Sequence, residues 1–370
     1  MKEARKSWGG AARGASGRFP RRAAACLVIL IITLLAAACD SSMDPDAPRE
    51  IIVASHDSFN IGADVIAEFE AEHDATVTIL RSGDAGEALT RAILTRDAPT
   101  ADLLYGVDNT FLGRALDEDI FRVYRSPLLD RVPEQYRLDP SNHVMPVDYG
   151  FVALNYDIAR LNENGAPPPS DLRALADPRY RGLTVAQNPA TSSPGLAFLL
   201  ATVATFGETG GYTWRDYWTD LLENDVLITD GWTDAYYTAF SLYGGDRPVV
   251  VSYTTSPAAE VFYSEGTHTT PPTASVLGDG AAFLQIEGIG ILEGARNVEL
   301  AERFVDFVMS RRFQEDFPTM MWVYPANADA ALPEVFQFAP VPARPASISP
   351  DEIAENRERW IDEWTALVRG

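Results

Sequence analysis

Short β-branched runs alternate with longer amphipathic stretches from residue 51 onward. Residues 51–54 predict a strand, and Val65, Ile66 and Phe69 follow it at helical spacing. The alternation continues with a predicted strand, helix and strand at 77–80, 88–94 and 102–105. This order is typical of βαβ units built on a parallel sheet.

A second set of the same kind follows the proline run at 167–169. Its predicted strands lie at 183–186, 226–229 and 249–252. Each is followed by a predicted helix, at 196–206, 235–242 and 258–263. Two such halves in one chain predict an α/β fold of two lobes with a cleft between them.

The first 38 residues follow a different pattern. Seven basic side chains and one acidic side chain precede an apolar run at 23–38, and the run leads into Cys39 through Leu-Ala-Ala-Ala. The run is shorter than the roughly 20 residues of a transmembrane helix and is typical of a secretory signal. The pattern resembles a bacterial lipoprotein signal, so we expect residues 1–38 to be removed and Cys39 to be acylated. An ordinary secretory signal and an uncleaved anchor are the alternatives.

The charge and the cysteine content of the chain limit its possible binding partners and its cellular location. The chain has 53 acidic and 30 basic residues, a net charge of -23, and such a field repels a phosphate backbone, which excludes nucleic acid. Cys26 lies in the segment expected to be removed, so Cys39 remains as the only cysteine and no disulfide is available. We interpret the polar residues 39–49 as a flexible tether. The expected product is a monomer held by its lipid anchor alone at the outer face of the cytoplasmic membrane, in the periplasm or at the cell surface.

Each loop after a predicted strand of the first half contains an aspartate: Asp57, Asp84 and Asp108. Ligands bind outside the carboxyl ends of parallel strands, because the loops converge there and helix N-termini point inward. The three carboxylates therefore predict an anionic rim on the cleft. A cap on the helix that follows is the alternative for each of them.

The loops of the second half offer hydroxyls and aromatic rings instead. Ser193 and Ser256 each precede a proline that can occupy the first helical position, so hydroxyls and free N–H groups would face the cleft. Helix capping is the alternative for both serines. Trp232 and Tyr253 offer flat faces to a ring or a cation, and packing in the core is their alternative.

At these residues the sequence resembles the thiamine-binding proteins of bacterial ABC importers, which have the class II periplasmic-binding-protein fold. The match spans most of the chain after the signal. Its motifs, in chain order, are Asp57-Ser58-Phe59, Gly106-Val107-Asp108-Asn109, Pro146-Val147-Asp148-Tyr149-Gly150, Thr191-Ser192-Ser193-Pro194-Gly195-Leu196, Gly231-Trp232 with Ala235-Tyr236, Ser252-Tyr253-Thr254-Thr255-Ser256-Pro257-Ala258, and Trp322 with Tyr324-Pro325.

The resemblance implies two parallel-sheet lobes joined by two crossover strands, at 146–155 and 282–290, that act as a hinge. The implied segments are a signal peptide at 1–38 and a tether at 39–49. Lobe one is implied at 50–147 with 288–345, lobe two at 148–287 and a C-terminal helix at 346–370. A capping box begins the C-terminal helix at Ser349. An apolar stripe along that helix predicts that Trp360 and Trp364 lie in the core.

The resemblance also implies a function. The chain would capture thiamine or its phosphates between two closing lobes and deliver the ligand to the permease and ATPase of an ABC transporter, as a binder with no enzymatic activity and no cofactor. Carried over by position, the family's ligand contacts fall on Asp84, Ala85, Ser192, Ser193, Trp232, Tyr253, Thr254, Thr255, Ser256 and Trp322. Thiamine is a cation with two aromatic rings, so carboxylates and aromatic faces suit it. Two positions depart from the family: His56 stands where a tyrosine is expected, and Ala259 replaces an aromatic residue.

Other functions stay open. A ferric-ion binder of the same fold would use adjacent tyrosines such as Tyr236 and Tyr237, although adjacent helical residues point about 100° apart. A polyamine or a phosphonate would also suit a binder of this fold. An enzyme could use the clustered carboxylates as acid and base. Against that reading, the four histidines lack metal-ligand spacing, and the sequence has no P-loop, G-x-S-x-G or H-E-x-x-H motif.

Overall fold

The computed structural model describes residues 49–370. The expected signal peptide, Cys39 and the tether up to residue 48 lie outside the described residues. The strands are β1 (Arg49–Ser55), β2 (Ala75–Arg81), β3 (Leu103–Asp108), β4 (Phe121–Arg122), β5 (Met145–Asp157), β6 (Thr184–Gln187), β7 (Leu227–Thr229), β8 (Val249–Tyr253), β9 (Thr273–Ser275), β10 (Ala282–Leu292) and β11 (Tyr324–Pro325).

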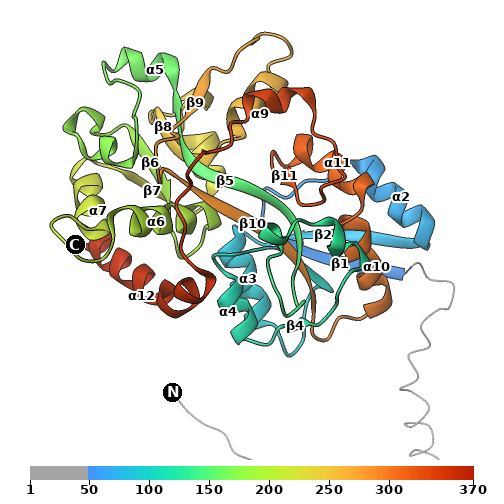
Figure 1. Ribbon diagram of the computed structural model, residues 1–370. Helices are drawn as coiled ribbons and strands as arrows, with labels where there is room; N and C mark the ends of the chain where they lie inside the picture. Colours follow the sequence, from blue (N-terminus) through green and yellow to red (C-terminus); the bar gives the residue numbers. More distant parts are fainter. Residues whose placement is uncertain (1–48) are drawn as a thin grey trace, which may run out of the picture. The chain divides into compact units, whose positions relative to one another are not determined.

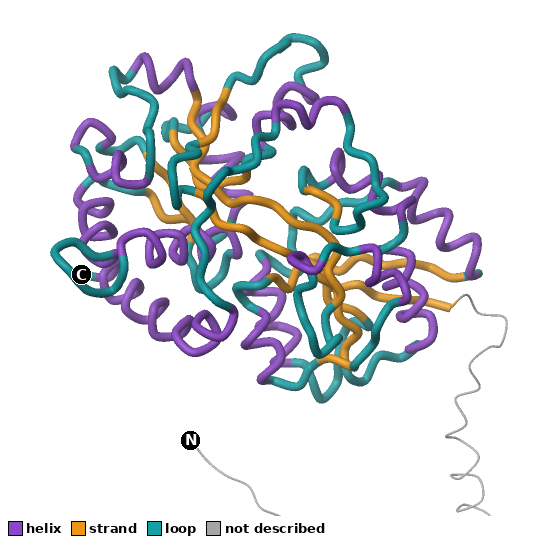
Figure 2. Tube along the Cα trace, in the orientation of Figure 1, coloured by secondary structure: helices purple, strands orange, loops and turns teal. Residues whose placement is uncertain are grey.

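Helices follow most of the strands (Figure 2). The helices are α2 (Ala63–His73), α3 (Ala85–Leu94), α4 (Leu112–Asp117), α5 (Ile158–Glu163), α6 (Ser193–Phe206), α7 (Trp214–Glu223), α8 (Trp232–Asp234), α9 (Ser256–Tyr263), α10 (Val298–Val308), α11 (Arg311–Met320) and α12 (Pro350–Arg369). Short 3-10 turns are η1 (Pro127–Arg131), η2 (Glu134–Tyr136), η3 (Leu172–Ala176), η4 (Pro178–Tyr180), η6 (Ser241–Tyr243) and η7 (Glu334–Phe338), and a π-helical turn is η5 (Ala235–Ala239).

The strands of the described part form one mixed sheet in the order β2-β1-β3-β10-β5-β8-β6-β7, with β4, β9 and β11 at its sides. Strands β2, β1 and β3 are parallel and make the first half-sheet. Strands β8, β6 and β7 are also parallel and make the second half-sheet. The α/β fold predicted from the sequence is therefore confirmed, but the two expected sheets are continuous with each other.

Strands β5 and β10 join the two half-sheets (Figure 1). They pair antiparallel from Ala153 with Ala282 to Met145 with Ile289, with one shift in register after Glu287. Strand β3 pairs with the C-terminal half of β10, whereas β8 pairs with the C-terminal half of β5. The half-sheets therefore attach to opposite ends of the same two strands. The expected crossovers are confirmed, and both strands run two residues further than expected at their C-terminal ends.

Three local expectations are corrected by the structure. Strand β1 begins at Arg49, inside the expected tether, because Arg49 and Glu50 pair with β2. Strand β3 continues to Asp108, which was expected in a loop. The helix expected at 235–242 is replaced by the π-turn η5 and the 3-10 turn η6, which follow the short helix α8. The division of the chain into lobes at 147 and 288 stays a prediction.

Buried apolar side chains cover both faces of the first half-sheet. Helices α2, α10 and α11 supply Phe69, Phe304 and Phe313 to one face, and α3 and α4 cover the other. Helix α6 is buried along most of its length and is apolar on every side, as expected for a helix enclosed by protein. These packed layers fix the positions of the loops at the strand ends.

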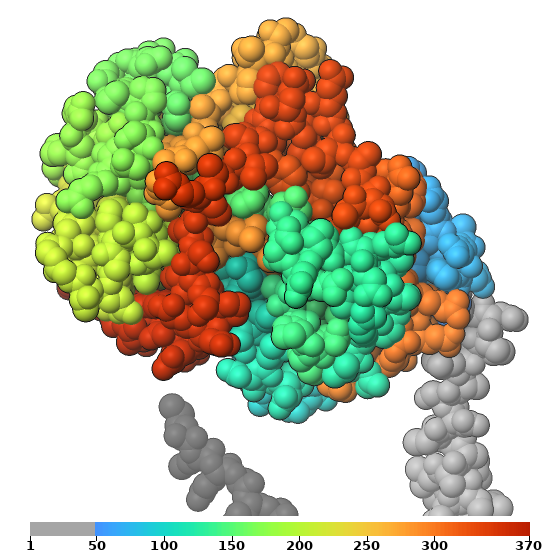
Figure 3. All heavy atoms as spheres, viewed as in Figure 1, coloured from blue at the N-terminus to red at the C-terminus, as the bar shows by residue number. Residues whose placement is uncertain are grey.

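The last segment of the chain passes along both half-sheets. Arg344 accepts a hydrogen bond from Gly280 N (3.0 Å) and Ala346 N donates to Ala282 O (2.6 Å), so this segment lies beside the start of β10. Figure 3 shows it in red between the yellow-green and the teal residues. Ser349 then caps α12 by accepting a hydrogen bond from Glu352 N.

Helix α12 packs on helices from both half-sheets. The Arg357 guanidinium lies over the Phe111 ring at the start of α4, 4.5 Å from its centroid. Trp364 meets Trp218 of α7 edge to face, with centroids 5.5 Å apart. Trp360 and Trp364 are both buried, so their predicted place in the core is confirmed.

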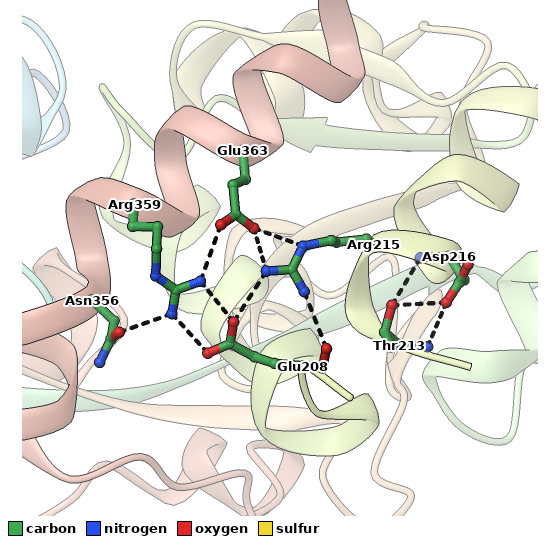
Figure 4. Close-up of polar contacts among 7 residues, drawn as sticks. All are labelled: Glu208, Thr213, Arg215, Asp216, Asn356, Arg359 and Glu363. Carbon is green, nitrogen blue, oxygen red and sulfur yellow. Dashed lines mark hydrogen bonds and ion pairs between the residues drawn. The ribbon is translucent and has the colours of Figure 1, made fainter. Parts of the chain in front are cut away.

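An ion-pair network ties the outer face of α12 to the end of α6 and to α7 (Figure 4). Arg359 donates to both Glu208 oxygens at 2.7 and 2.8 Å and to Glu363 at 3.1 Å. Arg215 contacts the same two carboxylates. The Arg359 hydrogen bonds lower the pKa of Glu208 to about 2.

We expect Trp364→Ala to lower the free energy of unfolding by about 3–5 kcal/mol, because it leaves a cavity between α12 and α7. Arg359→Ala should lower it by about 1 kcal/mol or less, since the network is partly exposed to water. Urea unfolding of both variants at pH 7 measures the two losses. Equal losses would contradict the assignment of α12 docking to apolar packing.

Candidate ligand-binding site

A cavity of about 410 Å³ lies where loops from the two half-sheets meet. Its volume falls within the usual range of small-molecule sites. Nine of the residues predicted as ligand contacts line it: Asp57, Asp84, Ala85, Ser193, Trp232, Tyr253, Thr255, Ser256 and Trp322. Three others, Asp108, Ser192 and Thr254, do not line it and are buried.

Three helices begin at the cavity. Ala85, Ser193 and Ser256 are the first or second residues of α3, α6 and α9, and all three line the cavity wall. Helix N-termini carry free N–H groups and the positive end of the helix dipole, so they favour an anionic or hydroxyl group. This wall of the cavity suits the polar end of a ligand.

The two serines before proline do not cap their helices. The N-cap residues of α6 and α9 are Ser192 and Thr255, and neither makes a side-chain cap hydrogen bond. The Ser256 hydroxyl lies 2.9 Å from that of Ser252. Among the described residues, the buried Ser193 hydroxyl has no hydrogen-bond partner. An unpaired buried hydroxyl costs about 1–3 kcal/mol, so Ser193 is poised to bond a ligand.

Asp84 connects the two halves of the cavity wall. One carboxylate oxygen caps α3 by accepting from Ala85 N (2.9 Å), and the other accepts from Trp232 N (2.9 Å) at the start of α8. Burial raises the pKa of Asp84, and these two N–H donors oppose the rise. Asp84 therefore both caps a helix and fastens the half-sheets together.

The other two aspartates of the expected rim have different surroundings. Asp57 is exposed, lines the cavity and accepts a hydrogen bond from Gly83 N at 3.0 Å. Asp108 lies away from the cavity, because its carboxylate turns to the N–H groups of Thr110 (2.8 Å) and Phe111 (3.1 Å). The rim therefore contains Asp57 and Asp84. The capping alternative holds for Asp84, which caps α3, and not for Asp108, because the N-cap residue of α4 is Phe111.

Gly86 marks the closest approach of α3 to the second half-sheet. Its N–H donates to the Thr191 carbonyl at 2.9 Å, and a Cβ added at this position would lie 2.7 Å from the same oxygen. Only glycine allows this approach without displacing backbone. The halves are therefore in direct contact beside the cavity.

Two indole rings line the cavity. Trp232 stacks on Tyr236 with centroids 4.8 Å apart, and its Nε1 donates to Ser252 Oγ at 2.9 Å. Trp322 stacks on Phe336 at 5.9 Å. Its φ of 58° is unfavourable for a residue with a Cβ, by about 1–2 kcal/mol. Strain of this kind is typical of binding sites and is held here in part by the Thr255 hydroxyl, which donates to the Trp322 carbonyl.

The floor of the cavity is a buried acidic group at the hinge strands. Glu287 of β10 lines the cavity and pairs across the sheet with Asp148 of β5. The Tyr105 hydroxyl donates to Asp148 at 2.7 Å, and His56 Nε2 lies 3.7 Å from Glu287 Oε1. Burial and mutual repulsion raise the pKa of Glu287 well above its usual value, and burial raises that of Asp148 to about 7. Burial lowers the pKa of His56 to about 4, so this imidazole is neutral at pH 7.

Sequence reasoning missed several lining residues. Glu287 had a signal, since it is the single charged residue in the apolar strand β10. Tyr237 was considered only as an iron ligand, and Tyr236 as an iron ligand and as part of a family motif. Tyr236 is buried and donates to Glu260 at 2.7 Å, whereas Tyr237 is half exposed at the cavity. Tyr243 and Tyr263, which also line the cavity, carried no motif.

The described residues contain neither a cluster of metal ligands nor a membrane-spanning helix. Within residues 49–370, histidine, cysteine, aspartate and glutamate nowhere gather in a group of three able to hold a metal ion. Over the same residues, every helix is too short or too polar to cross a bilayer.

The chain is similar in sequence to known solute-binding proteins. A family model described as bacterial extracellular solute-binding protein matches residues 98–356. The chain is 30% identical to the thiamine-binding periplasmic protein of Salmonella typhimurium over 325 residues, which cover 86% of this chain and 93% of the relative. It is 31% identical to the thiamine-binding periplasmic protein of Brucella melitensis over 329 residues, 87% of this chain and 93% of the relative.

A solved structure gives the same result in three dimensions. The structure of a periplasmic thiamin binding protein superposes with a TM-score of 0.77 at 28% sequence identity. The match covers 86% of this chain and 96% of that one. The fold predicted from the motifs is thus found in a protein of known structure.

We expect Gly86→Ala to separate the halves, because the added methyl group meets a backbone oxygen and such overpacking costs about 1–3 kcal/mol. Small-angle X-ray scattering should report a larger radius of gyration. Gly211→Ala is the matched control, since a Cβ at Gly211 meets nothing within 4 Å. An unchanged radius in both variants would show that the contact at Gly86 yields locally.

The acidic floor predicts how stability depends on pH. Raised pKa values mean that the folded protein holds more protons than the unfolded chain above about pH 4, so this contribution is full at low pH and is lost as the pH rises through about 7. The lowered pKa of His56 acts in the opposite direction, below about pH 6.5.

We expect Asp148→Asn to reduce the fall in unfolding free energy between pH 5 and pH 8 by more than about 1 kcal/mol. Urea unfolding at both pH values measures the difference. Asp97→Asn, at an exposed carboxylate, should leave the fall as in the unmodified protein. Parallel profiles for all three proteins would contradict the assignment.

Proposed function

The chain belongs to the family of bacterial extracellular solute-binding proteins, and from this premise we propose that it captures thiamine or a thiamine phosphate in the cavity between its half-sheets. The resemblance to thiamine-binding proteins seen in the sequence motifs is confirmed by the relatives, which carry that name and align over most of the chain. The family is one of binders, in agreement with the expectation that the protein is not an enzyme.

The arrangement of the cavity walls carries the proposal. Two indole faces, Trp232 and Trp322, lie in the same cavity as three helix N-termini. Thiamine has two flat rings, one of them cationic, and ends in a hydroxyl or phosphate group. Aromatic faces attract the cationic ring, and the helix N-termini with Ser193 attract the other end.

The carboxylates set the charge of the site. Asp57 lines the cavity at the surface and Glu287 lines its floor. The Asp57 carboxylate near the aromatic rings favours a cation over a neutral analogue, whereas the raised pKa of Glu287 favours its protonated, hydrogen-bonding form. The departures at His56 and Ala259 bear on which thiamine compound is preferred, because both side chains line the cavity.

Transport completes the proposed role. Binding between two half-sheets joined by β5 and β10 suits capture by closure and release by opening. We propose that the ligand passes to the permease and ATPase of an ABC importer, and that acylated Cys39 holds the monomer at the outer face of the cytoplasmic membrane, in the periplasm or at the cell surface.

Isothermal titration of the full-length chain in detergent tests the proposal with thiamine, thiamine monophosphate and thiamine diphosphate. We expect one-to-one binding of at least one compound, with a change in tryptophan fluorescence. Trp232→Ala should weaken binding by about 1–3 kcal/mol through lost stacking and cation contact. Leu94→Ala, at an exposed apolar residue outside the cavity, should leave the dissociation constant unchanged. No heat with any of the three compounds would overturn the proposed ligand.

A further inference from the structure

Ala259 leaves room on the cavity side of α9. It lines the cavity as the fourth residue of this helix, where the resemblance to thiamine-binding proteins implies an aromatic side chain. Tyr263 follows four residues later, so the two positions share one face of the helix. Helical side chains lean toward the N-terminus, and the Tyr263 ring therefore covers the turn that contains Ala259. Tyr263 also lines the cavity.

Two hydrogen bonds fix the Tyr263 ring in this position. Its hydroxyl donates to the Thr319 carbonyl at 3.3 Å and accepts from Trp322 Nε1 at 3.2 Å. The ring packs against the Trp322 indole with centroids 5.5 Å apart. A side chain that is 59% exposed and still held at both its ring and its hydroxyl loses little entropy when a ligand packs on it.

Tyr237 is brought to the same cavity by the π-helical turn η5. Phe240 N donates to Ala235 O at 2.9 Å, a bond across five residues that widens the turn. Tyr236 then points into the core, whereas Tyr237 is 51% exposed and lines the cavity. The Tyr237 ring stands at 84° to that of Trp232 and at 86° to that of Tyr236. Turns of this kind are frequent at functional sites.

The exposure of these rings places them at the entrance. Glu287 and His56 at the floor are each 5% exposed, against more than half for Tyr237 and Tyr263. Burial raises the pKa of Tyr237, with a smaller contribution from the Tyr263 phenol. Each phenol ring also stands beside one of the two indole rings of the cavity: the Tyr237 and Trp232 centroids are 5.5 Å apart, and so are those of Tyr263 and Trp322.

We propose that Tyr237 and Tyr263 form an aromatic clamp that holds the outer ring of the bound ligand, and that the clamp replaces the aromatic side chain missing at Ala259. The proposal rests on the proposed function for the identity of the ligand. The clamp suits a flat, cationic ring, because the faces of phenol rings are electron-rich. It makes Tyr237 and Tyr263 determinants of specificity in this chain.

Isothermal titration of full-length variants tests the clamp, with the best-bound thiamine compound as ligand. We expect Tyr237→Leu and Tyr263→Leu each to raise the dissociation constant about three- to thirty-fold. Tyr237→Phe keeps the ring and should bind within about two-fold of the unmodified protein. Ala259→Tyr added to Tyr263→Leu should restore affinity, because it returns a ring to the same helix face.

Leu94→Ala is the control, since Leu94 is an exposed apolar residue that does not line the cavity. Its affinity should not change. Near-ultraviolet circular dichroism confirms that every variant is folded. Equal affinities for the two leucine variants and the unmodified protein would overturn the clamp and leave the proposed function intact.

Failure of the proposed function has a different signature. The unmodified protein would then bind none of the three thiamine compounds, and N-methylnicotinamide, a flat cation unrelated to thiamine, becomes the probe. Saturable binding that both leucine substitutions abolish would support the clamp. Absence of saturable binding to this probe as well would overturn it.

Discussion

The pairing of β5 with β10 is the constraint on which the rest of the structure depends. Both half-sheets of parallel strands are attached to this one antiparallel pair. The pair also carries Asp148 and Glu287 side by side, so the strands that join the halves form the floor of the cavity. A like-charged pair at this point is tolerated because burial and mutual repulsion favour the protonated form of one partner, while the hydrogen bond from the Tyr105 hydroxyl stabilises the charged form of Asp148.

Much of the fold was predictable because its signals are local. The β-branched runs and helical spacings of both halves predicted the strands at nearly their observed bounds, and the apolar stripe placed Trp360 and Trp364 in the core. The continuity of the sheet was not predictable from periodicity, since it depends on pairing between strands that are more than 100 residues apart, such as β5 and β10.

In the candidate site, too, the residues with a local sequence signal were predicted and those without one were missed. Asp84, Ser193 and Trp232 were found because they lie in loops at strand ends, where loops converge, and Trp322 was found through the family resemblance. Tyr237 and Tyr263 carried no motif, since one reaches the cavity through a π-turn and the other from the far end of a short helix. Asp108 was misplaced because its strand continues three residues beyond the predicted end at 105, and its carboxylate accepts hydrogen bonds from the N–H groups of Thr110 and Phe111.

Helix α12 contacts helices of both half-sheets without lining the cavity. Any rotation about β5 and β10 that widens the entrance must therefore slide α4 and α7 relative to this helix, a shear of packed surfaces. Because opening would disturb the packing of α12 on α4 and α7, the helix opposes opening and lowers the population of open molecules. A larger closed fraction raises the apparent affinity for ligand, since less of the binding free energy goes into closing the halves. The strength of α12 packing, which depends on residues remote from the ligand, is therefore a second means of tuning affinity and the rate of release.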